Sequence, residues 1–255
     1  MANKRVLEFA ALTDTGLVRA HNEDAMLVCA DYGCAVLADG MGGYQAGEVA
    51  SAMAVEIIAQ YLCLKMDAAW LPAFSLWPRN LARWMVEAVE LANRRVLQAA
   101  QTESDYFGMG TTVVVACCVQ DKLLLAHVGD SRAYRYRDAC LTRITTDHSV
   151  LQEQIDAGHI SEQEARFSSI KNLITRAVGS QEMLEVELHA HSMRQGDIYL
   201  MCSDGLTDML NHDEIQTILH LHSSDLSACC RALIASANRH GGMDNITVIL
   251  FKPTH

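Results

Sequence analysis

Aspartates recur in this sequence at the ends of apolar segments. AVLADG, LLLAHVGDS and IYLMCSDG contribute Asp39, Asp130 and Asp204 at their ends, while RAHNEDAMLV and GGMDNITVILF place Asp24 and Asp244 just before such a segment. A strand holds a carboxylate at its tip rigidly, and a glycine after the aspartate lets the backbone turn sharply or approach an ion. This pattern indicates carboxylates that are aimed at a ligand.

These five aspartates are more informative together than singly. One Asp-Gly after a strand is most often an ordinary turn. If the strands are neighbours, however, the carboxylates meet, and like charges at close range raise one another's pKa unless a cation is present. A set of oxygen ligands suits Mg²⁺ or Mn²⁺ rather than zinc or copper. Two such ions about 3.5–4 Å apart can share a bridging water and clamp an in-line displacement at phosphorus, so the sequence predicts a metal-dependent hydrolase site.

Arg19 adds a candidate phosphate-binding group. It stands four residues before Glu23, next to the acidic cluster. A guanidinium can hold a phosphate through two parallel hydrogen bonds. An isolated arginine would be interpreted as a surface residue, and its position beside the carboxylates favours the functional interpretation.

The elements that must position these residues are short apolar strands and paired helices. Strands are predicted over Ala25–Cys29, Cys34–Ala38, Thr111–Val119, Leu123–Val128, Ile198–Cys202 and Ile246–Phe251. Helical periodicity covers residues 47–65, 79–101, 211–222 and 224–240, with Asn211 and Ser224 or Asp225 as N-caps. Strict strand–helix alternation is absent, which favours an α+β domain of antiparallel sheets covered by helices.

Composition narrows the class of protein further. The chain has 255 residues, half of them hydrophobic, and a net charge of −11, which supports a sizeable core and counts against nucleic acid as a partner. No signal peptide and no run long enough for a membrane span is found. The nine cysteines show no CxxC pair or zinc spacing, so we expect reduced core thiols in a cytoplasmic protein. No linker composition or repeat divides the chain, and one domain over residues 1–255 is predicted.

An ordered set of motifs then resembles the metal-dependent protein serine/threonine phosphatases of the 2C type, in their stand-alone bacterial branch. The motifs are RAHNED (19–24), LADGMGG (37–43), the Gly47–Glu48 pair, GTT (110–112), HVGDSRAY (127–134), TTDHS (145–149), LITRAVG (173–179), CSDGLTD (202–208) and DNITVI (244–249). The resemblance runs from roughly Phe9 to Phe251, nearly the whole chain. One motif alone would be weak, and the ordered set is specific.

The resemblance implies a fold, a metal centre and a reaction. The fold is a four-layer αββα arrangement, a central antiparallel β-sandwich flanked on both sides by paired helices. The centre holds two Mn²⁺ or Mg²⁺ ions, with a third, weaker ion in bacterial members. A hydroxide bridging two metals hydrolyses phosphoserine or phosphothreonine in proteins, without a phosphoenzyme, and a bacterial Ser/Thr kinase supplies the phosphorylated proteins. A single catalytic domain with no predicted additional domain suggests a monomer.

The resemblance also implies a role for each matching residue. Asp39 bridges both metal ions, the Gly40 carbonyl binds one of them, and Asp204 and Asp244 complete the site of the other ion. Glu23 and Asp24 hold metal-bound waters, and Asp130 binds the third ion together with Asp204. Arg19 binds the substrate phosphate. Catalysis would thus fall to Asp39, Asp204 and Arg19. The polar stretch 148–171, with a short helix in VLQEQIDAG, falls where the family carries a flap that influences substrate access.

Two positions depart from the family pattern. Met41 stands where other members carry a histidine that can protonate the leaving alkoxide, and a thioether donates no proton. Metal-bound water, or one of His21, His148 and His240, would have to serve instead. Tyr44 stands where bacterial members often carry a histidine. We expect this replacement to alter either the contacts to metal-bound water or the entry of substrate.

Two other functions are compatible with parts of the pattern. The bare aspartate set would also suit a two-metal phosphodiesterase or nuclease, against which the acidic pI of about 5.4 counts. A catalytically weak phosphoprotein-binding regulator would be expected to lose ligand aspartates, whereas the aspartates of this chain are retained.

Overall fold

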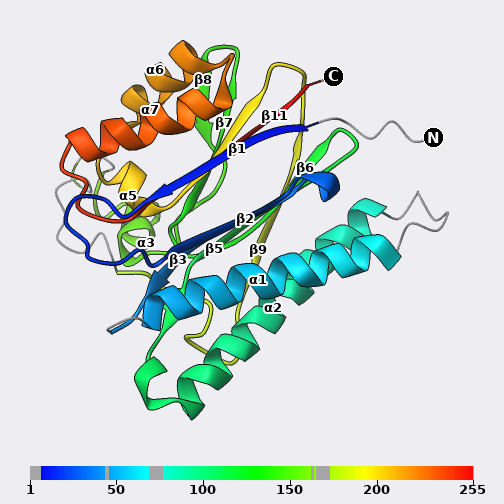
Figure 1. Ribbon diagram of the computed structural model, residues 1–255, viewed down its shortest axis with the longest axis vertical. Coiled ribbons are helices and arrows are strands. Elements are labelled where there is room, and N and C mark those ends of the chain that lie inside the picture. The colour runs from blue at the N-terminus through cyan, green and yellow to red at the C-terminus, as the bar shows by residue number, and fades with distance from the viewer. Residues whose placement is uncertain (1–6, 44–45, 69–76, 162–163, 165–172, 255) are drawn as a thin grey trace.

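Two antiparallel β-sheets stacked face to face form the centre of the molecule, and a pair of helices covers the outer face of each (Figure 1). The structure is a computed structural model that describes the chain except residues 1–6, 44–45, 69–76, 162–163, 165–172 and 255. This arrangement confirms the predicted four-layer αββα fold.

The first sheet has five strands in the order β1-β11-β10-β7-β8. Their bounds are β1 Leu7–Asp14, β11 Ile246–Pro253, β10 Ile198–Cys202, β7 Arg132–Arg137 and β8 Cys140–Arg143. Helices α6 (His212–His222) and α7 (Leu226–Arg239) lie on its outer face. Asn211 caps α6 in a capping box and Asp225 caps α7, as predicted, because each side chain accepts backbone N–H groups that the first turn leaves unpaired.

The second sheet has the order β2-β3-β5-β6-β9, with β4 paired to β3. Its strands are β2 Asp24–Cys29, β3 Cys34–Met41, β4 Gly110–Thr111, β5 Val113–Val119, β6 Lys122–Val128 and β9 Glu187–Ser192. Helices α1 (Ala46–Ala68) and α2 (Trp77–Thr102) cover it. Among the described helices, α1 alone is long and apolar enough to cross a membrane, with a mean hydropathy of 1.4 over its best window. Its buried side chains belong to the core between this sheet and α2.

The central strands are apolar on both faces because each sheet is covered on both sides there. Leu37, Leu125 and Phe251 pack between the sheets, whereas their neighbours Leu124 and Leu250 face the two helix layers. This double burial explains the continuous apolar runs in the sequence, which alternation alone would not predict.

Four strands were missed from the sequence. They are β1, β7, β8 and β9, with the sequences LEFAALTD, RAYRYR, CLTR and ELHAHS. Arginine, tyrosine, glutamate or histidine occupies alternate positions in β7 and β9, so neither resembles an apolar run. β8 and β9 are also edge strands, and the outward side chains of β9 face solvent.

Short helices and connections complete the described fold. α3 (Val150–Asp156) begins at Ser149, whose side chain accepts the Gln152 N–H, and it confirms the short helix predicted in the flap. Part of the predicted flap, residues 162–163 and 165–171, lies outside the described residues. The remaining short elements are α5 (Asp204–Thr207), η1 (Ala30–Tyr32) and η3 (Ser104–Tyr106).

Candidate metal centre

Strand register brings the predicted aspartates to one end of the sandwich. In the β2–β3 pair, Asp24 lies directly opposite Asp39. Strands β10 and β11 are also antiparallel neighbours, so Asp204, which follows β10, and Asp244, which precedes β11, meet at a shared end. Helix α5, which begins at Asp204, lies at the end of the sandwich away from the chain termini (Figure 1).

The electrostatics show that these carboxylates converge. Burial raises the pKa of Asp39 well above its ordinary value, and the nearby charges of Asp24, Asp204, Asp130 and Asp244 raise it further. Burial and neighbouring aspartates likewise raise the pKa of Asp204. The pKa values of Asp24 and Asp130 rise to about 6, in both cases chiefly through burial. Like charges that raise one another's pKa at such close range would be stabilised by a bound cation.

The residues fit a divalent metal centre. Asp24 is buried, and its Oδ2 accepts a hydrogen bond from the Ser203 hydroxyl at 2.8 Å. Its Oδ1 is buried with no partner among the described residues. A hard cation, or a water bound to one, would satisfy this oxygen together with the neighbouring carboxylates.

Two threonines fix Asp39 by its backbone. The Asp39 N–H donates to Thr112 Oγ1 at 3.0 Å, and the Asp39 carbonyl accepts from the Thr112 N–H and the Thr111 hydroxyl, both at 2.8 Å. The strand predicted over Thr111–Val119 is interrupted at Thr112, between β4 and β5. Both segments pair with β3 in one register, and at Thr112 the Asp39 N–H donates to the side-chain hydroxyl instead of the backbone carbonyl. The two threonines of the GTT motif therefore hold the backbone of Asp39 in place.

Two glycines allow backbone segments to approach the site closely. A Cβ on Gly40 would lie 2.1 Å from the carbonyl oxygen of Gly47, and one on Gly205 would lie 2.0 Å from that of Asn245. A Cβ on Gly47 would lie 2.8 Å from the Glu23 carboxylate carbon. Only glycine fits at Gly40 and Gly205, where the neighbour is backbone. At Gly47 the absence of a side chain lets the Glu23 carboxylate lie against the start of α1.

Two contributors to the site were missed from the sequence. The Asn245 side chain donates to the carbonyls of Thr15 and His21, both at 2.9 Å, and accepts the Glu23 N–H at 2.7 Å. It thus fixes the loop that carries Arg19 and Glu23. Asp208 raises the pKa of both Asp130 and Asp204. Asn245 follows Asp244 in the DNITVI motif and could have been found there, whereas Asp208 offered no signal beyond its place in CSDGLTD.

Arg19 lies at the rim of the carboxylate cluster. Its Nη2 is 2.7 Å from Asp244 Oδ2, and half of its side chain is exposed. The hydrogen bond that Arg19 donates to Asp244 is the main cause that raises the pKa of Arg19. The predicted phosphate-binding residue therefore stands beside the predicted metal ligands, with a solvent-facing guanidinium.

The three histidines considered as proton donors occupy different environments. His148 is buried, with Nδ1 accepting the Gly129 N–H and Nε2 2.9 Å from Glu187 Oε2. His240 bonds to the Ser236 carbonyl and lies 3.2 Å from Glu214. His21 is exposed, and its charge lowers the pKa of Glu23 against the larger effect of burial. Of the three, His21 is the one that faces both solvent and an acidic residue of the site.

Of the two positions that depart from the family pattern, the structure describes only Met41. Met41 ends β3 and pairs with Gly110. Tyr44 lies outside the described residues.

Comparison with known proteins identifies the family. The family model for protein phosphatase 2C matches residues 18–243. The chain is 37% identical over 243 residues to the serine/threonine phosphatase stp of Listeria monocytogenes, covering 94% of this chain and 93% of that protein. It is 34% identical over 249 residues to the protein phosphatase PhpP of Streptococcus pneumoniae, with 96% of each chain covered.

Solved structures agree with the sequence comparison. The Mycobacterium tuberculosis serine/threonine phosphatase PstP/Ppp superposes with a TM-score of 0.87 at 36% identity, covering 98% of this chain and all of that one. A PstP catalytic domain in complex with two manganese ions gives a TM-score of 0.84 at 36% identity over 97% of this chain and 98% of that one. The chain belongs to the protein phosphatase 2C family and is a metal-dependent protein serine/threonine phosphatase.

Proposed function

We propose that this enzyme hydrolyses phosphoserine and phosphothreonine in proteins with a hydroxide that bridges two divalent metal ions, Mn²⁺ or Mg²⁺. The observation that supports this proposal is the convergence of buried and partly buried carboxylates with raised pKa values at one end of the sandwich. Such a cluster attracts divalent cations, and bound cations make the same pocket attractive to phosphate.

The proposed ligand assignment is the one that the family resemblance implies, and the placement of the carboxylates supports it. Asp39, which is surrounded by four other aspartates, is proposed to bridge the two ions, with the Gly40 carbonyl on one of them. Asp204 and Asp244 complete the other. Glu23 and Asp24 orient bound waters, a role compatible with the unpartnered Asp24 Oδ1. Asp130, whose charge raises the pKa of Asp204, forms a third, weaker site with it.

Arg19 is proposed to bind the substrate phosphate. Its guanidinium contacts Asp244 through Nη2. When Asp244 binds a metal ion, its negative charge is compensated, and the half-exposed guanidinium is free to pair with phosphate oxygens. Arg19 then orients the phosphoryl group over the metal centre.

His21 is proposed to help protonate the leaving alkoxide, since Met41 cannot. The other two candidate histidines have both ring nitrogens engaged by described residues. His21 is exposed at the rim, on the loop that Asn245 fixes.

The cellular setting follows from the relatives. The similar proteins come from bacteria and are described as serine/threonine phosphatases or protein phosphatases. We propose that this one acts in the cytoplasm, as a single catalytic domain and a monomer, on proteins phosphorylated by a Ser/Thr kinase. The flap, residues 148–171, is proposed to control access of those substrates.

A comparison of three substrates tests the proposed function. Protein stripped with EDTA and supplied with Mn²⁺ should hydrolyse p-nitrophenyl phosphate and a phosphothreonine peptide, and should lose both activities when EDTA is restored. Faster cleavage of bis(p-nitrophenyl) phosphate than of the monoester would indicate a phosphodiesterase. Binding of the phosphopeptide without turnover at any metal concentration would indicate a regulator.

A further inference from the structure

A stripe of ionisable side chains lines the inner face of edge strand β9. In the sequence ELHAHS, Glu187, His189 and His191 are partly buried, whereas the intervening Leu188 and Ala190 are exposed. β9 pairs with β6, in which His127 lies opposite Glu187. This edge of the sandwich therefore carries imidazoles and a carboxylate where the centre of the sandwich carries leucines.

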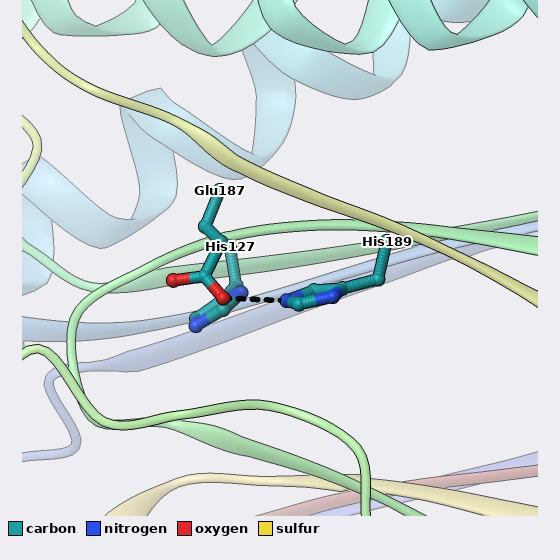
Figure 2. Close-up of side chains that lie close together, drawn as sticks. All are labelled: His127, Glu187 and His189. Atoms are coloured by element: carbon teal, nitrogen blue, oxygen red, sulfur yellow. Dashed lines mark hydrogen bonds and ion pairs between the residues drawn. The ribbon is translucent and has the colours of Figure 1, made fainter. Parts of the chain in front are cut away.

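Three of these side chains converge on one point. His127, Glu187 and His189 each offer one ligand atom, and these atoms all lie within 4.8 Å of one another (Figure 2). Glu187 Oε1 is 2.7 Å from His189 Nε2, and the His127 ring lies beside the same carboxylate (Figure 2). Ligand atoms around a tetrahedral zinc ion are roughly 3.3 Å apart, so a small adjustment of side chains would enclose an ion.

His127 supplies an unpaired buried lone pair. Its side chain is 0% exposed, and its Nε2 is 2.8 Å from the Thr146 carbonyl oxygen. A carbonyl only accepts, so Nε2 carries the proton and Nδ1 is left as an acceptor. This Nδ1 has no hydrogen-bond partner among the described residues. A buried acceptor without a partner costs free energy, and a bound cation would remove that cost.

Outer contacts orient two of the three groups as in protein metal sites. His127 is fixed by the Thr146 carbonyl. His148 accepts the Gly129 N–H at Nδ1, so its Nε2–H donates to Glu187 Oε2 at 2.9 Å and leaves Oε1 for a ligand. Metal-ligating histidines and carboxylates characteristically have such partners, which fix tautomer and ring orientation. Burial also lowers the pKa of His127, which keeps the ring neutral and able to ligate.

We propose that His127, Glu187 and His189 form a second metal site, separate from the aspartate cluster, that binds a zinc-type transition ion. Two imidazoles and one carboxylate suit Zn²⁺ or Co²⁺, whereas the all-oxygen cluster suits Mn²⁺ or Mg²⁺. The ligand atoms are His127 Nδ1, Glu187 Oε1 and His189 Nε2, with water in the fourth position. The ion replaces the proton between Glu187 and His189, and that proton moves to His189 Nδ1.

Such an ion would tie the edge strand to a loop next to the catalytic end. His127 is bonded to Thr146, and His148 joins Glu187 to Gly129, which precedes Asp130. Binding would therefore stabilise β9 and the segment from Thr146 to Ser149 at the same time.

The test separates this site from the catalytic one by metal binding rather than activity. The full-length Asp39→Asn/Asp204→Asn variant weakens the oxygen-only centre. In this background, calorimetric titration should find one Zn²⁺ per chain, and Co²⁺ should give the intense visible absorption of a four-coordinate nitrogen-containing site instead of the weak spectrum of an octahedral oxygen site. Adding His189→Ala or Glu187→Gln should weaken Zn²⁺ binding by about 100-fold or more, since loss of an outer partner alone costs about 10–100-fold.

His191→Ala provides the matched control. His191 lies on the same strand and face, two residues beyond His189, and is not one of the three ligands. This variant should bind Zn²⁺ like its parent. All variants should keep the parent's circular dichroism, because the His189 and Glu187 side chains are each about one-third exposed. Zn²⁺ binding that is absent in the parent, unaffected by His189→Ala or equally lost in His191→Ala would overturn the assignment.

Discussion

Two groups of buried or partly buried carboxylates in this molecule differ in where their counter-charge comes from. Asp197 is fully buried, and Arg137 pairs with it through two hydrogen bonds of 2.6 Å. Burial alone would raise the pKa of Asp197, but the bonds from Arg137, the Arg194 N–H and Tyr199 outweigh it and lower the pKa. Among the described residues no arginine pairs with Asp39, and its pKa is raised.

The presence or absence of an arginine partner distinguishes carboxylates with a structural role from carboxylates suited to bind a ligand. Asp147 repeats the first pattern, since Arg132 donates to both of its oxygens. In the aspartate cluster the one arginine ion pair between described residues joins Arg19 to Asp244, at the exposed rim. A buried charge without a partner is unstable. The aspartate cluster is therefore suited to bind cations from solution.

Removing one charge from the cluster should have the largest effect on activity. Asp39→Asn should lower kcat by about a thousandfold or more, equivalent to about 4 kcal/mol, because Asp39 is proposed to touch both metals. In EDTA the same variant should unfold at a temperature equal to or above that of the wild type, because repulsion is relieved. Turnover within tenfold of the wild type would contradict the ligand assignment.

Removing the charge of an arginine-paired carboxylate should instead reduce stability strongly and change activity little. Asp197→Asn leaves Arg137, with a side chain 16% exposed, without its anion, and breaking a buried pair costs about 3–5 kcal/mol. Denaturant unfolding should show this loss, while kcat of the folded protein stays near the wild-type value. A stability loss as small as that of Asp39→Asn would erase the distinction between the two groups.

Stabilisation by metal should depend on pH in a defined direction. The pKa values of Asp24 and Asp130 are raised from 3.8 to about 6. Between pH 3.8 and about pH 6 the metal-free native state binds more protons than the unfolded state. The stability of the metal-free native state therefore falls as pH rises through this range. Mn²⁺ competes with those protons. The increase in Tm on adding Mn²⁺ should be larger at about pH 7.5 than at about pH 5, and an equal increase would contradict this titration.

The smallest effect is expected at the rim. Arg19→Ala should raise KM for a phosphothreonine peptide by about tenfold, or about 1.4 kcal/mol, with a smaller change in kcat. Arg19→Lys should recover part of this loss, because it keeps the charge but not the bidentate geometry. An unchanged KM would mean that Arg19 serves Asp244 alone.

The sequence predicted most of the fold and singled out the aspartates that the structure brings together at one end of the sandwich. Strand-end aspartates such as Asp39 and Asp204 were recognisable because each follows an apolar run long enough to be a buried strand. Edge strand β9 was not, because the sandwich leaves its outer side in solvent and its inner side carries Glu187 and His189. No local pattern identifies such a strand before its partner β6 is known.

The missing parts of the site depend on contacts between distant segments. Asn245 fixes the Glu23 loop across 222 positions of sequence, and Arg132 and Arg137 become recognisable as counter-charges only when Asp147 and Asp197 are placed beside them. Spacing within the chain does not contain this information. Family motifs supplied candidate roles, and the folded structure supplied the electrostatic contrast.

The most direct test of the central claim is the metal dependence of phosphopeptide hydrolysis by EDTA-stripped protein. The account predicts no turnover of a phosphothreonine peptide without added metal, and recovery on titration with Mn²⁺ that saturates with two ions per chain. Undiminished turnover in excess EDTA, or full recovery with no metal bound at the aspartate cluster, would contradict it.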